Sequence, residues 1–184
     1  MEATEMLMEE HKIIERVLAS LELGARRLDE GKTMRAGFFI EAADFVRDFA
    51  DGCHHKKEEG ALFPAMELAG IPKQGGPISV MLEDHEEGRR LIRAMRAAAE
   101  KMDAGDASTK SEIAQNAQDY AALMRNHITM ENNILFPMAD NAMPTGNQVK
   151  VAEAFKRINQ AATAEGVYQK YLDLAEALER ESKA

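Results

Sequence analysis

The chain has 184 residues, 45% of them hydrophobic and 30% charged, which predicts a globular domain with a substantial core rather than a disordered segment. The formal net charge of -9 argues against nucleic acid or an anionic membrane surface as the main partner. The one cysteine, Cys53, excludes an internal disulfide, and no apolar run could serve as a signal peptide or membrane span, so we expect a cytoplasmic protein.

Helical periodicity runs through most of the chain, because apolar residues recur at alternating steps of three and four. The pattern is clearest over residues 7–28, 78–102 and 113–135, while residues 39–58 are apolar over a broader face. Such steps are typical of helices that pack nearly antiparallel. The sequence therefore predicts an all-α protein, specifically an up-down-up-down four-helix bundle.

Turn-forming residues separate these predicted helices. The breaks are DEGKT at 29–33, AGIPKQGGP at 69–77 and DAGDAST at 103–109. We expect Thr109 and Glu112 to form a capping box that starts the fourth helix. Pro64 and Pro137 are expected to mark the ends of the second and fourth helices, because proline cannot continue a regular helix.

The last part of the chain carries a separate pattern. Two shorter helical stretches are predicted over about 148–160 and 165–181, without an ionisable cluster that would indicate chemistry. Their apolar residues that could contact the bundle are Val151, Phe155, Ile158, Tyr168, Tyr171, Leu172, Ala175 and Leu178. We therefore expect a four-helix domain over residues 1–140 and a helical extension over 141–184 that packs on it.

An internal repeat joins the two halves of the predicted bundle. The segments HHKKEEGALFP (54–64) and NHITMENNILFP (126–137) share His-x3-Glu before Leu-Phe-Pro, which aligns His127 with His54 and Glu131 with Glu58. In the same way MEEHKIIERVL (8–18) aligns with LEDHEEGRRLI (82–92), and thus His11 with His85. The four helices are therefore interpreted as two copies of one helical hairpin.

The predicted topology brings the repeated groups to one layer near one end of the bundle, because two histidines lie near helix starts and the His-x3-Glu pairs near helix ends. Burying six such groups without partners costs roughly several kcal/mol each. Two metal ions would offset this cost, and mixed nitrogen and oxygen ligation suits iron or manganese well and zinc less specifically. The predicted ligands are His11, His54, Glu58, His85, His127 and Glu131.

Neighbouring residues have competing interpretations. A lone inward histidine is usually a hydrogen-bonded core residue, and it is the repeat that favours metal ligation here. His55 follows three aspartates at helical spacing, which predicts a solvated stripe, although His55 with Glu59 is a weaker candidate ligand pair. Glu15 and Arg89, each four residues after a predicted ligand, form either an ion pair behind the site or ordinary surface charges.

Sulfur-containing and aromatic residues near the predicted ligands are also open to two interpretations. We expect Cys53 to be a buried structural residue rather than a redox-sensitive thiol. Met81, Tyr120 and Met124 lie on the ligand-bearing faces, where they either wall a small pocket or fill the core.

Through His11, HHKKEEGALFP, EDHEEGRR and NHITMENNILFP, residues 5–140 resemble the hemerythrin-like family, specifically the hemerythrin HHE cation-binding domain. The resemblance implies a non-haem di-iron centre with two bridging carboxylates and an oxo or hydroxo bridge, held by the six predicted ligands. Oxygen-carrying hemerythrins have a further histidine one turn from the position of His85. Here Met81 and Arg89 stand one turn away, so the resemblance implies four histidines and irons with different open positions.

The function expected from these features is binding or sensing of O2, NO or a related small ligand by two iron ions, with manganese or zinc as alternatives. The first alternative is a di-iron redox enzyme that reduces peroxide or oxidises Fe(II). The second is a protein of iron handling or nitrosative-stress repair, in which the metal itself is exchanged. The expected partners are a diatomic ligand or peroxide, with neither nucleic acid nor membrane.

Overall fold

The computed structural model describes residues 1–164 and 167–184, and every regular element among them is helical. The predicted all-α class is therefore confirmed. None of the described helices is long and apolar enough to cross a membrane. The predicted stretch over 165–181 begins at two residues outside the described ones.

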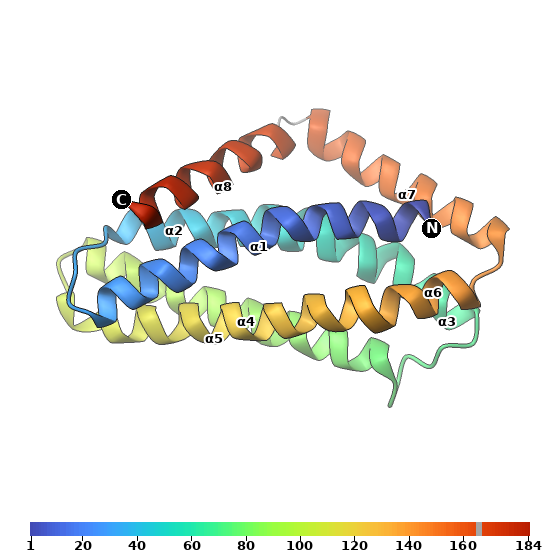
Figure 1. Ribbon diagram of the computed structural model, residues 1–184, viewed down its shortest axis with the longest axis horizontal. Helices are drawn as coiled ribbons and strands as arrows, with labels where there is room; N and C mark the ends of the chain where they lie inside the picture. Colours follow the sequence, from blue (N-terminus) through green and yellow to red (C-terminus); the bar gives the residue numbers. More distant parts are fainter. Residues whose placement is uncertain (165–166) are drawn as a thin grey trace.

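Four long helical segments, which we call the main segments, lie side by side and alternate in direction along the chain (Figure 1). The first is α1 and the third is α4. The second and fourth are built from shorter helices that continue into one another with few or no residues between them. The bounds are α1 Glu2–Asp29; α2 Ala36–Phe45, η1 Val46–His55, η2 Glu58–Leu62 and α3 Phe63–Leu68; α4 Pro77–Asp103; and, after the 3-10 turn η3 Ala107–Thr109, α5 Lys110–Met130, η4 Glu131–Leu135 and α6 Phe136–Ala142.

Two of the predicted helix ends are wrong, because the chain stays helical through both prolines. The elements η2 and η4 are π-helical turns: the Phe63 N–H donates to the Glu58 carbonyl, and the Phe136 N–H donates to the Glu131 carbonyl, each five residues back. Pro64 and Pro137 then stand in the first turn of a new α-helix, where a missing N–H costs little. The chain therefore continues as a helix at both positions where the sequence predicted a helix end.

The start of α5 also differs from prediction. Thr109 precedes α5, but its hydroxyl does not cap the helix, because it donates to the carbonyls of Ala98 and Asp106. The carboxylate of Asp106 instead accepts a hydrogen bond from the Ser108 N–H at 3.0 Å. The predicted capping box is therefore replaced by a cap on the preceding 3-10 turn.

The apolar core is divided into two clusters by a polar layer. On α1, Leu7 belongs to the smaller cluster and Ile14 to the larger one, and the buried His11 lies between them. The same order recurs on the second main segment, where His54 and Glu58 separate the two clusters. The corresponding flanking pairs on the other segments are Ala50 and Leu62, Leu91 and Met81, and Ile128 and Leu135.

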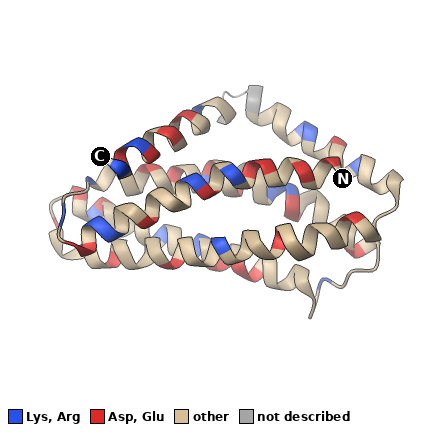
Figure 2. Cartoon of the chain, in the orientation of Figure 1, with Lys and Arg blue, Asp and Glu red and all other residues tan. Residues whose placement is uncertain are grey.

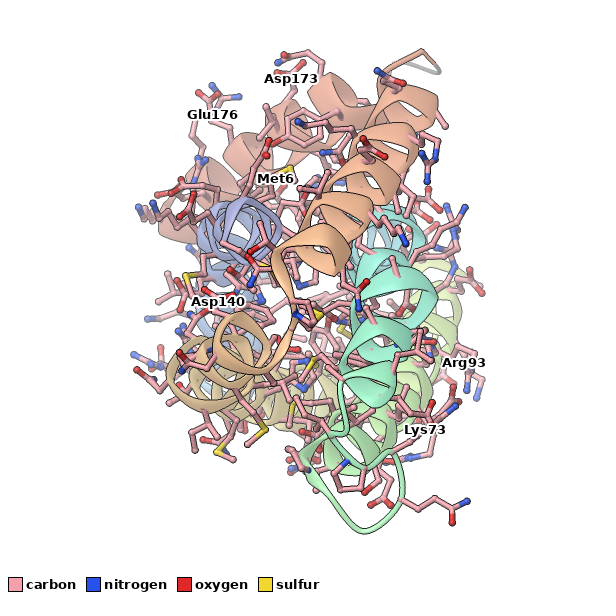
Figure 3. All side chains as sticks on the ribbon, turned by 90° about the vertical axis from the view of Figure 1, so that its right-hand side faces the viewer. Met6, Lys73, Arg93, Asp140, Asp173 and Glu176 are labelled. Carbon is pink, nitrogen blue, oxygen red and sulfur yellow. The ribbon has the colours of Figure 1, made fainter. Side chains whose placement is uncertain are left out.

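The C-terminal residues form α7 Thr145–Ala164 and α8 Val167–Lys183, which make an arch over the side where α1 and the second main segment face each other (Figures 1 and 3). Of the predicted contact residues, five are buried: Val151, Phe155, Tyr171, Ala175 and Leu178. Both α1 and α8 carry acidic and basic residues (Figure 2), and Arg16 of α1 pairs with Glu179 of α8 at 2.8 Å. The extension therefore lies against the main segments through both apolar and ionic contacts.

Candidate metal centre

The polar layer contains two groups of side chains whose potential ligand atoms lie within 4.8 Å of one another in each group. We call them group A and group B. All their members are buried, and Glu58 belongs to both. Group A is His11, His54, Glu58 and Glu131, and group B is His55, Glu58, His85 and His127. The structure thus brings together all six predicted residues from four main segments, and adds a seventh.

Each glutamate contacts one histidine of its own segment and one of the other hairpin. Glu58 lies 3.1 Å from Nε2 of His54, four residues earlier, and 3.4 Å from Nε2 of His85. Glu131 lies 3.3 Å from Nε2 of His127 and 3.2 Å from Nε2 of His11. The equivalent residues of the two hairpins therefore make equivalent contacts. Each carboxylate contacts a histidine of its own hairpin and a histidine of the other hairpin.

The inner atoms of the layer fit a bound cation better than a hydrogen-bonded network. All four carboxylate oxygens of Glu58 and Glu131 are buried without a hydrogen-bond partner among the described residues, because the nearby imidazole nitrogens stand outside hydrogen-bond geometry. Nε2 of His11 also faces Nε2 of His54 at 3.0 Å, although both nitrogens are the natural ligand atoms. Nitrogen and carboxylate donors of this kind suit iron, manganese or zinc, so the residues present fit a metal.

The outer nitrogen of every histidine has an oxygen partner. Because a carboxylate or amide oxygen only accepts, each Nδ1 carries its hydrogen outward and leaves Nε2 available to the interior. Such partners fix the ring orientation of metal-binding histidines. The Nδ1 partners are Asn132 for His11 at 2.9 Å, Glu10 for His54 at 3.0 Å, Asp51 for His55 at 2.8 Å, Glu59 for His85 at 2.7 Å and Asp84 for His127 at 3.3 Å.

Protons occupy the layer when no metal is bound. Burial would lower the pKa of His54, but the Glu58 and Glu10 carboxylates outweigh it and raise this pKa to about 10. Against the same opposing effect of burial, Glu58 and Glu59 raise the pKa of His85 to about 9. Burial and the charge of Glu58 raise the pKa of Glu131 to about 8. Burial and the charge of His54 lower the pKa of His11 to about 4. In metal-free protein near neutral pH, His54, His85 and Glu131 therefore hold protons at positions where ions would bind.

We expect metal binding to release protons and to strengthen as the pH rises. His54, His85 and Glu131 are protonated below pH 8 without metal and must lose these protons to act as ligands, so acid favours the metal-free form. Group A contains two of these protonated groups and group B one, so each ion should displace about one to two protons. Apparent affinity should therefore rise at least about tenfold per pH unit, or at least about 100-fold from pH 6 to 8, and level off near pH 9–10. Zn²⁺ titrations in buffers of different ionisation enthalpy measure this release. A pH-independent affinity would contradict the assigned protonation.

The prediction that His55 lies on a solvated stripe is wrong. Its side chain is 4% exposed, its ring stacks on His85 with 3.9 Å between centroids, and burial together with the charge of His85 keeps its pKa well below the usual range. The π-helical turns of η1 advance each residue by a smaller rotation than the 3.6-residue helix, so adjacent residues 54 and 55 both face inward. The repeat held a signal for this, because His55 aligns with Ile128, which is 2% exposed.

Replacing His55 with phenylalanine should weaken metal binding in group B alone. Phenylalanine keeps the ring stack on His85 but lacks the nitrogen that faces His127 and Glu58. We expect at least the roughly 10- to 100-fold loss of affinity that follows removal of an orienting partner. Chelator-competition titration with Co²⁺ measures both positions. Wild-type affinity at both would exclude His55 as a ligand.

Glu15 and Arg89 do not form the ion pair that their repeat positions suggested. Glu15 is exposed, whereas Arg89 donates to Asp51 at 3.1 Å and to Glu59 at 2.7 Å. Arg89 therefore holds in place Asp51 and Glu59, the partners of His55 and His85, a role that its position in the repeat did not indicate. The expectation of a buried cysteine is confirmed, because Cys53 is 2% exposed.

The residues that could wall a pocket instead fill the core. Met81, Tyr120 and Met124 are each no more than 2% exposed and belong to the two apolar clusters. Gly88 permits their close packing, because a Cβ at this position would lie 3.3 Å from both the Met124 sulfur and the Tyr120 ring. The core interpretation therefore holds for these three residues.

Comparisons with known proteins agree with this geometry. The family model of the hemerythrin HHE cation binding domain matches residues 2–139. The uncharacterized protein Rv1995 of Mycobacterium tuberculosis is 29% identical over 178 residues, which cover 97% of this chain and 69% of that protein. The iron-sulfur cluster repair protein YtfE of Edwardsiella ictaluri is 29% identical over 127 residues, which cover 66% of this chain and 57% of that protein. The iron-sulfur cluster repair protein YtfE of Enterobacter sp. is 32% identical over 88 residues, which cover 47% of this chain and 40% of that protein. No solved structure gives a significant match.

Proposed function

The chain belongs to the hemerythrin HHE cation-binding domain family, and we propose that it holds two iron ions between groups A and B. The observation that carries the proposal is the position of Glu58 and Glu131, whose four buried oxygens find no hydrogen-bond partner among the described residues. A carboxylate with one oxygen toward each group can join two neighbouring ions. His11 and His54 would hold the first ion, and His55, His85 and His127 the second.

We also propose how the helices around the two ions are arranged. The four main segments form an up-down-up-down four-helix bundle over residues 1–140, and residues 141–184 form an extension outside the matched family domain. The bundle supplies one buried layer that the two hairpins share. This arrangement explains why metal ligands recur at offsets of 73 and 74 residues along the chain.

The proposed role of the centre is to bind or sense O2, NO or a related small ligand. Bound iron would supply the redox chemistry and a coordination position for such a ligand. The protein's own contribution is to exclude water and fix the imidazoles, since no member of either group is more than 4% exposed. With His55 included, five imidazoles face the interior. The number of histidines therefore no longer distinguishes this chain from the oxygen-binding members of the family.

Iron handling or repair is the second candidate function. It is favoured by the relatives whose names describe iron-sulfur cluster repair, although the match covers 57% or less of those proteins. In that role the iron itself would leave the centre. The conversion of peroxide with an electron donor remains the enzymatic alternative at the same site.

Metal analysis and visible spectroscopy test the proposal together. Purified protein should contain iron at a ratio near two per chain, and its anaerobic spectrum should change on addition of O2 or NO and return after their removal. Continuous consumption of peroxide would favour the enzyme, and rapid loss of iron to a chelator from the folded protein would favour iron handling. If the visible spectrum of iron-loaded protein did not change on addition of O2, NO or peroxide, the proposal of ligand binding would be refuted.

A further inference from the structure

A fully buried lysine stands behind one of the proposed ligands. The Lys57 side chain is 0% exposed and its ammonium pairs with a carboxylate oxygen of Glu10, which is itself 4% exposed. The other oxygen of Glu10 accepts the hydrogen bond from Nδ1 of His54 at 3.0 Å. Removing two charges from water is costly, so a buried pair at this position calls for a reason other than stability.

The internal repeat provides a comparison within the same molecule. Asp84 occupies the position equivalent to Glu10 and contacts Nδ1 of His127 in the other hairpin. The residue equivalent to Lys57 is Met130, which is 41% exposed. A lysine is therefore not a general requirement for orienting a histidine of this centre.

The difference between the hairpins follows from what covers each carboxylate. The Asp84 side chain is 24% exposed and water can solvate it, whereas the arch of α7 and α8 lies over the side that holds Glu10. Asn159 of α7 lies 3.7 Å from the Cys53 sulfur. A buried carboxylate without a countercharge is strongly unfavourable. The Lys57 ammonium therefore stabilises the charge of Glu10 inside the protein, as solvent stabilises the charge of Asp84 at the surface.

We propose that Lys57 and Glu10 are positioning residues for His54: the contact with the Lys57 ammonium fixes the Glu10 carboxylate, and Glu10 directs Nε2 of His54 toward the metal position shared with His11. The inference rests on the proposed function, because it concerns the metal of group A. It also assigns a role to α7 and α8, which lie outside the family match over 2–139 and contact both α1 and η1, the elements on either side of this ion pair. The metal position of group B depends instead on partly solvated carboxylates.

A double-mutant cycle separates positioning from structural support. Lys57→Met and Glu10→Leu each leave one buried charge unpaired, so each single variant should lower the melting temperature of the metal-free protein. Leucine, unlike glutamine, has no oxygen that could still accept the hydrogen bond from Nδ1 of His54. The double variant removes both charges and should recover most of that loss. If Glu10 positions His54, however, the double variant should still bind the group A ion about 10- to 100-fold more weakly, while the group B ion is bound as in the wild type.

Asp84→Leu is the matched control, because it removes the equivalent charge and the equivalent hydrogen-bond acceptor from the hairpin that has no buried lysine. It should weaken the group B ion alone and leave the stability of the metal-free protein nearly unchanged. Co²⁺ competition titration measures both affinities, and ¹⁵N NMR of Zn²⁺-loaded protein should show a hydrogen-bonded Nδ1–H for His54 that is lost or shifted in the double variant.

Two results would overturn the inference. Wild-type Co²⁺ affinity in a double variant of restored stability would make the pair purely structural, and equal weakening of both ions would remove its assignment to group A. Neither result would contradict the proposed function, because both concern the Lys57–Glu10 pair alone. A wild-type protein that binds neither Co²⁺ nor iron would instead overturn the proposed function and this inference together.

Discussion

Replacing Glu58 with glutamine should weaken the binding of both ions at once. Glu58 is the one residue that belongs to both groups, with one oxygen 3.1 Å from His54 and the other 3.4 Å from His85. Glutamine keeps the size of the side chain but removes its charge and one of the two acceptor oxygens. Loss of one partner from a buried charge interaction costs about 3–5 kcal/mol, so affinity at each position should fall by roughly two to three and a half orders of magnitude.

The control for this variant is Glu87→Gln. Glu87 is a surface residue that pairs with Arg90 at 2.6 Å, and its loss should leave metal content unchanged. Metal analysis after purification in defined iron measures the ratio of iron to protein in both variants. If Glu58→Gln kept one ion at wild-type affinity, the shared carboxylate would be ruled out, and groups A and B would have to be independent sites.

The sequence alone predicts the helical segments well, because burial follows their periodicity. The apolar steps of residues 7–28 and 78–102 become buried faces, and the breaks at 29–33 and 69–77 agree with the ends of α1 and α3. Gly31 and Gly70 have φ values of 73° and 94°, which glycine adopts readily, so these turn signals have a direct backbone cause. Local chemistry was sufficient for this part of the fold.

The prolines show where that reasoning fails. A proline ends a regular α-helix, but an extra residue in the preceding turn changes the hydrogen-bond register and lets the helical path continue. The turns that begin at Glu58 and Glu131 do this in both hairpins. Periodicity at steps of three and four contains no information on such a change, because it depends on the hydrogen bonds that form around the buried glutamates.

The predicted ligands were accessible because they repeat. Four histidines and two glutamates at matching positions identify a layer that one copy of the hairpin would not reveal. The roles of His55 and Lys57 were not accessible in this way, since these residues occur in one hairpin only; for His55 the repeat indicates burial, through Ile128, but not ligation. Lys57 is charged and resembles its exposed neighbour Lys56 in the sequence. Its burial beside Glu10 of α1 is a tertiary contact between distant parts of the chain, which the local sequence does not indicate.

Removal of the metal should lower the melting temperature by about 5–10 °C for each ion lost. An ion present at 100 times its dissociation constant stabilises the folded state by about 2.7 kcal/mol, and a domain of this size shifts by about 2–4 °C per kcal/mol. The physical reason is local: without metal, the oxygens of Glu58 and Glu131 stay buried without hydrogen bonds and protons must neutralise the layer. Thermal melts of iron-loaded and chelator-treated protein, with metal content verified in each, measure the shift. Chelator should leave the melting curve of Glu58→Gln unchanged, which separates metal loss from direct effects of the reagent. Coincident curves for the loaded and metal-free wild type would mean that no ion is held within this buried layer.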